Sequence, residues 1–288
     1  IPKELKKWIP WVLKDTPDRN CIPQFSKANT FLCDWPGTLK LNLKGKKLYF
    51  ELRYEVSRNY WITLPGNQKF WPQEVKVNKK QAQVIDDKGL PQILLRKGKH
   101  KITGEFYDFK NYSSLALPGN ISFVETFHNS KNIEHVRSKN GFLSYQFAKQ
   151  ASSKEKTKSF FRVKVFRKLS DYVPISLATR INVDYSGKPK EINLGKVLPQ
   201  NFVPLYLQSK IPLKLNQKSE LLLQVKTGSW EIYLDSHIKQ KITEVKFNTK
   251  NSYWPEKEIW AFNADNNFRQ VIVRNVNSVS KEGSGIPN

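Results

Sequence analysis

The sequence has 288 residues, of which 39% are hydrophobic and 12% aromatic, and its formal net charge at pH 7 is +24. That length is enough for two domains of ordinary size, and no segment approaches the roughly 20 apolar residues of a membrane-spanning helix. The positive charge comes from 39 Lys and 10 Arg, whereas proteins that grip phosphates or read bases favour arginine. The composition therefore argues against nucleic acid as a partner. We expect the lysines to cover a solvated surface, with electrostatic contact to anionic lipid or lipopolysaccharide as the alternative.

Both ends of the sequence suggest a fragment. The chain contains no methionine, and its last residues, 281–288, are mostly polar and include Gly and Ser. We expect a leader and further C-terminal domains to be missing from it. At the N-terminal end, Leu5, Trp8, Ile9 and Val12 have helical spacing, with Pro10 between them. This pattern predicts a short or kinked amphipathic helical segment within residues 1–15, packed against the base of the first domain, with contact to a membrane surface as the alternative.

The two cysteines predict a disulfide. Cys21 and Cys33 bracket a polar loop, and there is no third cysteine and no nearby His to complete a zinc site. Because disulfides persist mainly in oxidising compartments, the pair favours the periplasm or the cell exterior, with two free cytosolic thiols as the alternative.

Apolar and polar residues alternate with a period of two between residues 38 and 109. Leu48, Phe50 and Leu52, for example, alternate with Tyr49 and Glu51, which is typical of a strand with one face on a core. Such strands recur at intervals of about ten residues with turn residues between them, as in a sandwich or barrel.

A polar run rich in Lys and Ser at 148–159 is the predicted linker. A second alternating pattern begins after it at Phe161. We therefore predict an all-β chain of two consecutive β-sandwich domains, Ig-like or jelly-roll-like, over residues 1–150 and 160–288. The tetrapeptide Leu-Pro-Gly-Asn begins at Leu64 and again at Leu117, but it is too short to indicate an internal repeat.

No group of side chains in the sequence predicts catalysis, a cofactor or a metal site. Adjacent carboxylates at Asp86 and Asp87 precede Lys-Gly, which is typical of a hairpin turn, although such a pair could act in glycoside hydrolysis. Asn263, Asp265 and Asn267 alternate like calcium ligands, but the next residue is Phe where a calcium loop needs Gly. The four histidines have neither metal-ligand nor triad spacing.

The tryptophans are the remaining candidates for a binding site. Four of them lie at or near predicted strand ends, where an exposed indole could stack on a sugar ring. The alternative is that they plug the ends of the sandwiches. The four residues are Trp61, Trp71, Trp254 and Trp260.

Short motifs recur in order along nearly the whole chain, at 5–13, 33–37, 64–67, 71–73, 169–171, 198–205 and 254–262. On these motifs, the chain resembles the N-terminal region of a family of long, uncharacterised exported proteins of the Gram-negative envelope. The resemblance implies a leader, a large envelope-exposed region and a membrane anchor, but no established activity and no catalytic residues.

We favour a non-enzymatic binding or assembly module of a periplasmic, membrane-anchored envelope protein, with an envelope glycan or a protein partner as its ligand. Two alternatives stay open: accessory domains of a glycoside-processing enzyme whose catalytic domain lies elsewhere, and a structural spacer. A groove lined by two or more of the tryptophans would favour a glycan. Buried indoles would favour the spacer, and an exposed apolar edge strand would favour a protein that adds a strand.

Overall fold

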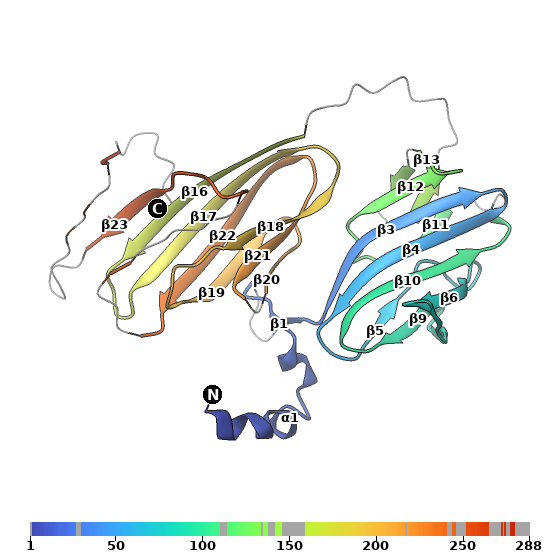
Figure 1. Ribbon diagram of the computed structural model, residues 1–288, viewed down its shortest axis with the longest axis horizontal. Helices are drawn as coiled ribbons and strands as arrows, with labels where there is room; N and C mark the ends of the chain where they lie inside the picture. Colours follow the sequence, from blue (N-terminus) through green and yellow to red (C-terminus); the bar gives the residue numbers. More distant parts are fainter. Residues whose placement is uncertain are drawn as a thin grey trace. The chain divides into compact units, whose positions relative to one another are not determined.

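Strands dominate the structure of this chain (Figure 1), so the predicted all-β, sandwich-like fold class is confirmed. The chain divides into two compact units, Ile1–Ile22 with Phe31–Lys154, and Pro23–Thr30 with Glu155–Asn288. Of the predicted linker at 148–159, only Ser159 is among the described residues. The computed structural model describes residues 2–26, 30–109, 114–133, 135–137, 142–145, 159–216, 218–240, 244–245, 252–264, 272, 274 and 277–279.

Three short helical segments begin the first unit: η1 (Lys3–Trp8), α1 (Ile9–Val12) and η2 (Pro17–Asn20). Pro10 lies in the first turn of α1, where its missing N–H costs no intrahelical hydrogen bond. It therefore starts the α-helical turn instead of interrupting it. No residue of η1 or α1 is buried, so the prediction that this segment packs against the base of the first domain is wrong. Within the described parts of the chain, no helix is long and apolar enough to cross a membrane.

The strands of the first unit form a seven-stranded sheet in the order β13-β12-β3-β4-β10-β6-β7 and two three-stranded sheets, β5-β9-β8 and β11-β15-β14, while β1 pairs with β2. Their bounds are β1 (Ile22–Pro23), β2 (Phe31–Leu32), β3 (Asp34–Lys44), β4 (Lys47–Val56), β5 (Tyr60–Thr63), β6 (Gln73–Val77), β7 (Lys80–Gln81), β8 (Ile85–Asp87), β9 (Leu90–Leu95), β10 (Gly98–Phe106), β11 (Ser114–Ala116), β12 (Val124–His128), β13 (Lys131–Asn132), β14 (His135–Arg137) and β15 (Phe142–Tyr145).

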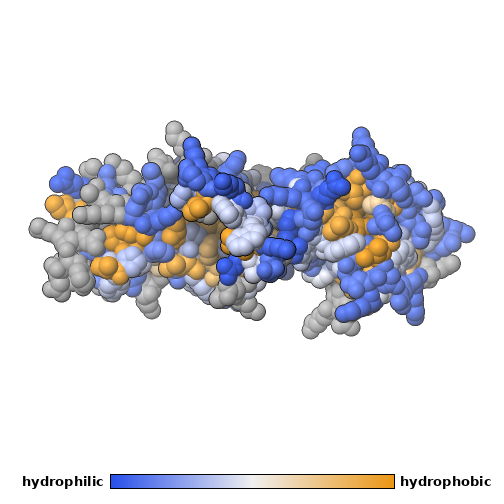
Figure 2. All heavy atoms as spheres, turned by 90° about the horizontal axis from the view of Figure 1, so that it is seen from below, coloured by the Kyte–Doolittle hydropathy of each residue, from blue (hydrophilic) through white to orange (hydrophobic). Residues whose placement is uncertain are grey.

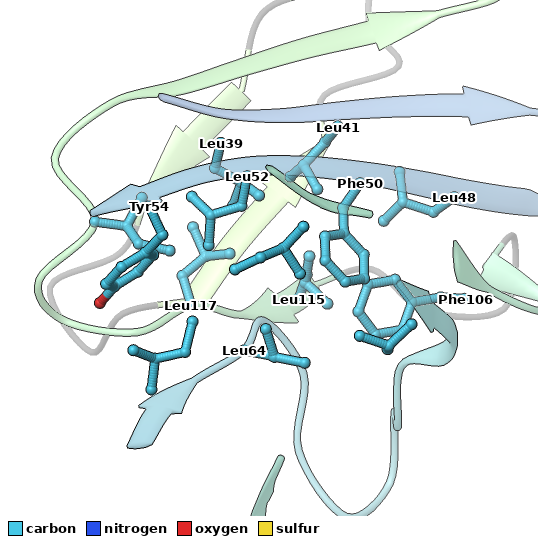
Figure 3. Close-up of a cluster of buried hydrophobic side chains, with 14 of the residues drawn as sticks. Leu39, Leu41, Leu48, Phe50, Leu52, Tyr54, Leu64, Phe106, Leu115 and Leu117 are labelled. Atoms are coloured by element: carbon cyan, nitrogen blue, oxygen red, sulfur yellow. The ribbon is translucent and has the colours of Figure 1, made fainter. Parts of the chain in front are cut away.

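The core of the first unit follows the predicted alternation. In β4, Leu48, Phe50 and Leu52 are buried, while Tyr49 and Glu51 point away from the core. Figure 3 shows the side chains of β3 and β4 converging with those of β10 and with Leu64 and Leu115 into one apolar cluster. Residues far apart in the sequence thus share one core, as a sandwich requires.

The second unit has a five-stranded sheet, β19-β22-β17-β16-β23, and a three-stranded sheet, β18-β21-β20. Side chains from both sheets, among them Val165, Ile181 and Leu223, form a second buried cluster. The bounds are β16 (Phe160–Ser170), β17 (Ser176–Ser186), β18 (Lys190–Lys196), β19 (Phe202–Ser209), β20 (Leu213–Leu215), β21 (Glu220–Val225), β22 (Gly228–Ile238) and β23 (Ile259–Asn263).

The two units repeat one strand topology. In each, an antiparallel hairpin (β3–β4, β16–β17) is extended by a long antiparallel strand (β10, β22) and then by a strand with a bulge (β6, β19). A further strand, β12 in the first unit and β23 in the second, pairs in parallel with the first strand of the hairpin. The small sheets β5-β9-β8 and β18-β21-β20 have the same order as well.

The strand register shows which residues are equivalent. Ile62 pairs with Ile93 and Ile192 with Leu223, while Ile102 pairs with Leu52 and Ile232 with Ile181. Three of the equivalent buried positions therefore share one sequence offset, from 62 to 192, from 93 to 223 and from 102 to 232, and Leu52 and Ile181 differ from it by one residue. The chain contains an internal structural repeat that the short tetrapeptide match did not indicate.

The turn before the third long strand repeats in detail. Gly98 and Gly228 open β10 and β22 with φ of 136° and 146°, a conformation that favours glycine. Two residues later, the Nε2 atom of His100 lies 2.6 Å from the Arg96 carbonyl oxygen, and the Nε1 atom of Trp230 donates to the Lys226 carbonyl oxygen at 2.9 Å. An aromatic ring thus closes the same turn in both units.

Candidate functional site

The four predicted tryptophans divide evenly between the two units. Trp61 and Trp71 belong to the first unit, and Trp254 and Trp260 to the second. Their exposures differ: Trp61 is 45% exposed and Trp260 37%, Trp71 is half-buried, and Trp254 is 9% exposed. These positions therefore have to be judged one by one.

Trp254 and Trp260 meet at a carboxylate. The indole N–H of Trp254 donates to Oε1 of Glu258 at 2.7 Å, and that of Trp260 donates to Oε2 at 2.8 Å. The same Oε2 accepts from Nε of Arg167 at 2.7 Å. The guanidinium carbon lies 5.7 and 5.4 Å from the two ring centroids, within the range of cation–π attraction.

Arg167 has no exposed surface, and its remaining donors also have partners. Nη1 donates to the hydroxyl of Thr179 at 3.0 Å and Nη2 to the carbonyl oxygen of Val197 at 2.9 Å. Burial lowers the pKa of this guanidinium, and the charge of Glu258 opposes that change. The cluster joins β16 and β17 to the segment around β23, and it leaves little of the Trp254 indole accessible for stacking.

Trp61 has the opposite environment. It lies on the outer face of the small sheet β5-β9-β8, directly across from Leu94, which is 50% exposed. Leu90, 43% exposed, is on the same face because residues of one strand at even spacing share a side. We call Trp61, Thr63, Asp87, Leu90, Gln92 and Leu94 the Trp61 face.

Polar groups border this apolar surface. Gln92 lies between Leu90 and Leu94 on β9, and its Nε2 atom donates to Oδ2 of Asp87 at 2.8 Å. A flat indole beside amide, carboxylate and hydroxyl groups offers both a stacking surface and hydrogen-bonding partners, which is what a sugar ring needs. Figure 2 shows hydrophobic patches interrupting a mainly hydrophilic surface on the side of the molecule that it displays.

The second unit has no such apolar pair at the equivalent place. In its small sheet, Glu191 takes the position of Trp61 and pairs across the strands with Gln224, which takes that of Leu94. Between the two small sheets, whose strands lie among the described residues, this exposed apolar pair is therefore found in that of the first unit. Sequence reasoning named Trp61 but missed Leu94, because only the strand register places the two side by side.

The other sequence candidates have ordinary structural roles where the structure describes them. Asp86 and Asp87 end β8 before a tight turn, and the backbone N–H of Gly89 donates to Asp86 at 2.6 Å. Of the suggested calcium ligands, Asp265 and Asn267 lie outside the described residues.

The predicted disulfide between Cys21 and Cys33 is confirmed. In the described part of the chain, one group of potential metal ligands comes together, namely these two sulfurs and Asp18. Because both cysteines are oxidised in the disulfide, the group offers no thiolate to a metal.

Comparison with known proteins finds no family model that matches this chain and no curated protein that matches it. The resemblance to exported envelope proteins therefore stays a prediction from sequence motifs. The candidate site is defined by its geometry.

Proposed function

We propose that this chain is a non-enzymatic binding module of a periplasmic envelope protein and that it binds an envelope glycan on the Trp61 face. The observation that carries the proposal is the exposed pair of Trp61 and Leu94 on one face of a small sheet. The Cys21–Cys33 disulfide supports an oxidising compartment such as the periplasm.

The sugar ring would lie on the indole of Trp61, with its C–H groups against the aromatic face. Thr63, Gln92 and Asp87 would exchange hydrogen bonds with the hydroxyl groups around that ring. This division of roles is the usual one in ligand sites, where an apolar surface supplies contact area and a few polar groups fix orientation. The equivalent pair of the second unit is Glu191 and Gln224, of which Gln224 is buried, and we expect no binding there.

A protein partner is the second candidate. Leu90 and Leu94 extend the exposed apolar surface beyond the indole, which suits an apolar side chain of a protein better than a sugar. The same variants test the glycan and the protein partner, since both ligands would bind the residues of the Trp61 face.

The test is binding of the purified chain to peptidoglycan and to lipopolysaccharide at low and high salt. Trp61→Ala should weaken binding at least tenfold, as loss of a central aromatic contact does, and the wild-type affinity should survive high salt because stacking is not screened. Tyr49→Ala is the matched control, since Tyr49 is another exposed aromatic residue of the first unit, 39% exposed on β4.

Equal affinity of the wild type and Trp61→Ala would exclude the Trp61 face. Binding that disappears at high salt would assign it to the lysines. Binding of an envelope protein, and not of either glycan, that depends on Trp61 and Leu94 would establish the second candidate.

A further inference from the structure

The N-terminal helical segment, Lys3–Val12, exposes nearly all of its apolar side chains. Leu5 is 53% exposed, Trp8 52%, Trp11 71% and Val12 63%. Neither η1 nor α1 contains a buried residue. The first unit's own core therefore does not use this apolar surface, and leaving it in water is unfavourable.

The segment is amphipathic. Leu5, Trp8, Ile9 and Val12 follow the i, i+3, i+4, i+7 spacing in the sequence; Leu5 and Trp8 share a face of the 3-10 helix η1, and Ile9 and Val12 lie three residues apart in the α-helical turn α1. Trp11 lies beside that face, its ring edge-on to that of Trp8 at a centroid distance of 6.1 Å. The two indoles thus form one aromatic surface next to the aliphatic side chains.

Lysines occupy most of the polar positions of the segment. Lys3, Lys6 and Lys7 lie within it and Lys14 lies two residues beyond it, against a single acidic residue, Glu4, between positions 3 and 14. All four ammonium groups belong to exposed residues. A partner that covers the apolar face and also carries negative charge at its surface would satisfy both parts of this segment.

We propose that Lys3–Val12 lies on the surface of an anionic phospholipid bilayer. Tryptophan is enriched at the level of the lipid headgroups, where its apolar body and polar N–H each find a suitable environment. A basic helix with Trp and Leu on its apolar face binds in the plane of that interface, and lysines strengthen the attraction to anionic lipid. Six 3-10 residues and four α-helical residues extend only about 18 Å, so the segment lies on the bilayer and does not cross it.

This contact is independent of the Trp61 face. It would attach the module to a membrane at one point and leave the glycan surface free. Failure of either proposal leaves the other standing, since the two use different residues and different ligands.

The test is flotation of the purified chain with vesicles of phosphatidylcholine containing 30% phosphatidylglycerol, and with vesicles of phosphatidylcholine alone. We expect binding to the anionic vesicles to be at least tenfold stronger. Lys6→Glu with Lys7→Glu should weaken it about 25-fold or more, at roughly fivefold for each lysine lost. Lys44→Glu with Lys46→Glu is the matched control, since it makes the same charge change at the β3–β4 turn, and it should weaken binding less than threefold.

The aromatic contribution needs a second pair of variants. Trp8→Ala with Trp11→Ala should weaken binding to anionic vesicles about tenfold and remove the quenching of tryptophan fluorescence by lipids with brominated acyl chains. Trp61→Ala should change neither result. Because no residue of the segment is buried, the Lys6/Lys7 and Trp8/Trp11 variants should keep the wild-type circular dichroism and melting temperature.

Three results would overturn the proposal. The first is equal binding to neutral and anionic vesicles. The second is an equal loss of binding in the Lys6/Lys7 and Lys44/Lys46 variants, which would assign it to the charge of the whole protein. The third is unchanged quenching in the Trp8/Trp11 variant, which would place the lipid contact elsewhere.

Discussion

The strands that the two units share have the same order, but two of the places at which their residues differ are of particular interest. On the first strand of the hairpin, Leu41 lies between Phe50 and Thr126 in the first unit, whereas Arg167 lies between Thr179 and Trp260 in the second. The first unit closes this part of its sheet with apolar packing, and the second closes it with a buried ion pair and two indoles. The same strand arrangement therefore accommodates two different ways of packing the strand that pairs in parallel with the hairpin, β12 or β23.

The small sheets differ as well, at a pair of residues that lie opposite each other on neighbouring strands. The first unit exposes Trp61 and Leu94 at the positions where the second has Glu191 and Gln224. The second unit has a buried charged residue, Arg167, where the first has Leu41. The first unit has exposed apolar residues, Trp61 and Leu94, where the second has polar ones. The shared core thus gives both units the same fold, while the residues at these two places differ between them.

The largest expected effect comes from giving the second unit the residue of the first. Arg167→Leu leaves the carboxylate of Glu258, which is 10% exposed, without its cation, and loss of one partner of a buried pair costs about 3–5 kcal/mol. Calorimetry should show this loss in the unfolding of the second unit. Arg167→Leu with Glu258→Gln removes both charges, keeps an acceptor oxygen for one of the two indole N–H groups and should recover more than half of the loss. A double variant no more stable than the single one would contradict the account of the cluster.

The disulfide is a second asymmetry, because both cysteines of the chain belong to the first unit. Replacing Cys21 and Cys33 with Ser should lower the free energy of unfolding of the first unit by about 3 kcal/mol, from the entropy of the opened loop. Thermal unfolding with and without reductant checks this. The reductant should shift the wild type and leave the double Ser variant unchanged, and an equal shift in both would refute the prediction.

The repeated turn provides a finer comparison. Gly98→Ala and Gly228→Ala both place a side chain at a strongly positive φ, which costs about 1–2 kcal/mol. The added Cβ would lie 3.9 Å from Nε2 of His100 in one case, but 2.9 Å from Cζ2 of Trp230 in the other. Chemical denaturation should therefore show the larger loss for Gly228→Ala, and the reverse order would count against the equivalence of the turns.

The smallest effect concerns Asp184, whose pKa is lowered by hydrogen bonds from Ser229 and from Arg162. A carboxyl group with a lowered folded pKa stabilises the fold above its ordinary pKa of 3.8, and this stabilisation is lost as the pH falls through the folded value. Asp184→Asn should cost less than about 1 kcal/mol at pH 7, because the pair is partly exposed. Melting curves at several pH values should show the difference from wild type narrowing below pH 3.8. A constant difference would exclude a charge-dependent origin.

The alternation of residues predicted much of this fold. Leu48, Phe50 and Leu52 have the buried positions that a period of two assigns to them. Arg167 follows Phe161, Val163 and Val165 in this alternation, so a period of two predicts that its side chain points inward. This pattern was the signal in the sequence for its burial. The partner Glu258 could not be predicted, because it comes from a distant segment that only the parallel pairing of β16 and β23 brings close.

The repeat and the Trp61 face depend on register, which the local sequence does not define. Equivalent positions such as His100 and Trp230 differ in residue type, so the sequences of the two units do not match although their turns do. Whether an indole near a strand end is exposed depends on which neighbours cover it. For this reason Trp254 and Trp61, alike in sequence context, have opposite environments.

The most direct test replaces the two exposed apolar residues of the first unit's small sheet with the residues at the equivalent positions of the second. Trp61→Glu with Leu94→Gln gives the first unit the residues of the second, and the binding of this variant to peptidoglycan and lipopolysaccharide is the measurement to make. We predict a loss of at least tenfold in affinity at high salt, with an unchanged melting temperature, because both side chains are about half exposed. Wild-type affinity in a folded variant would contradict the claim that this face binds the ligand.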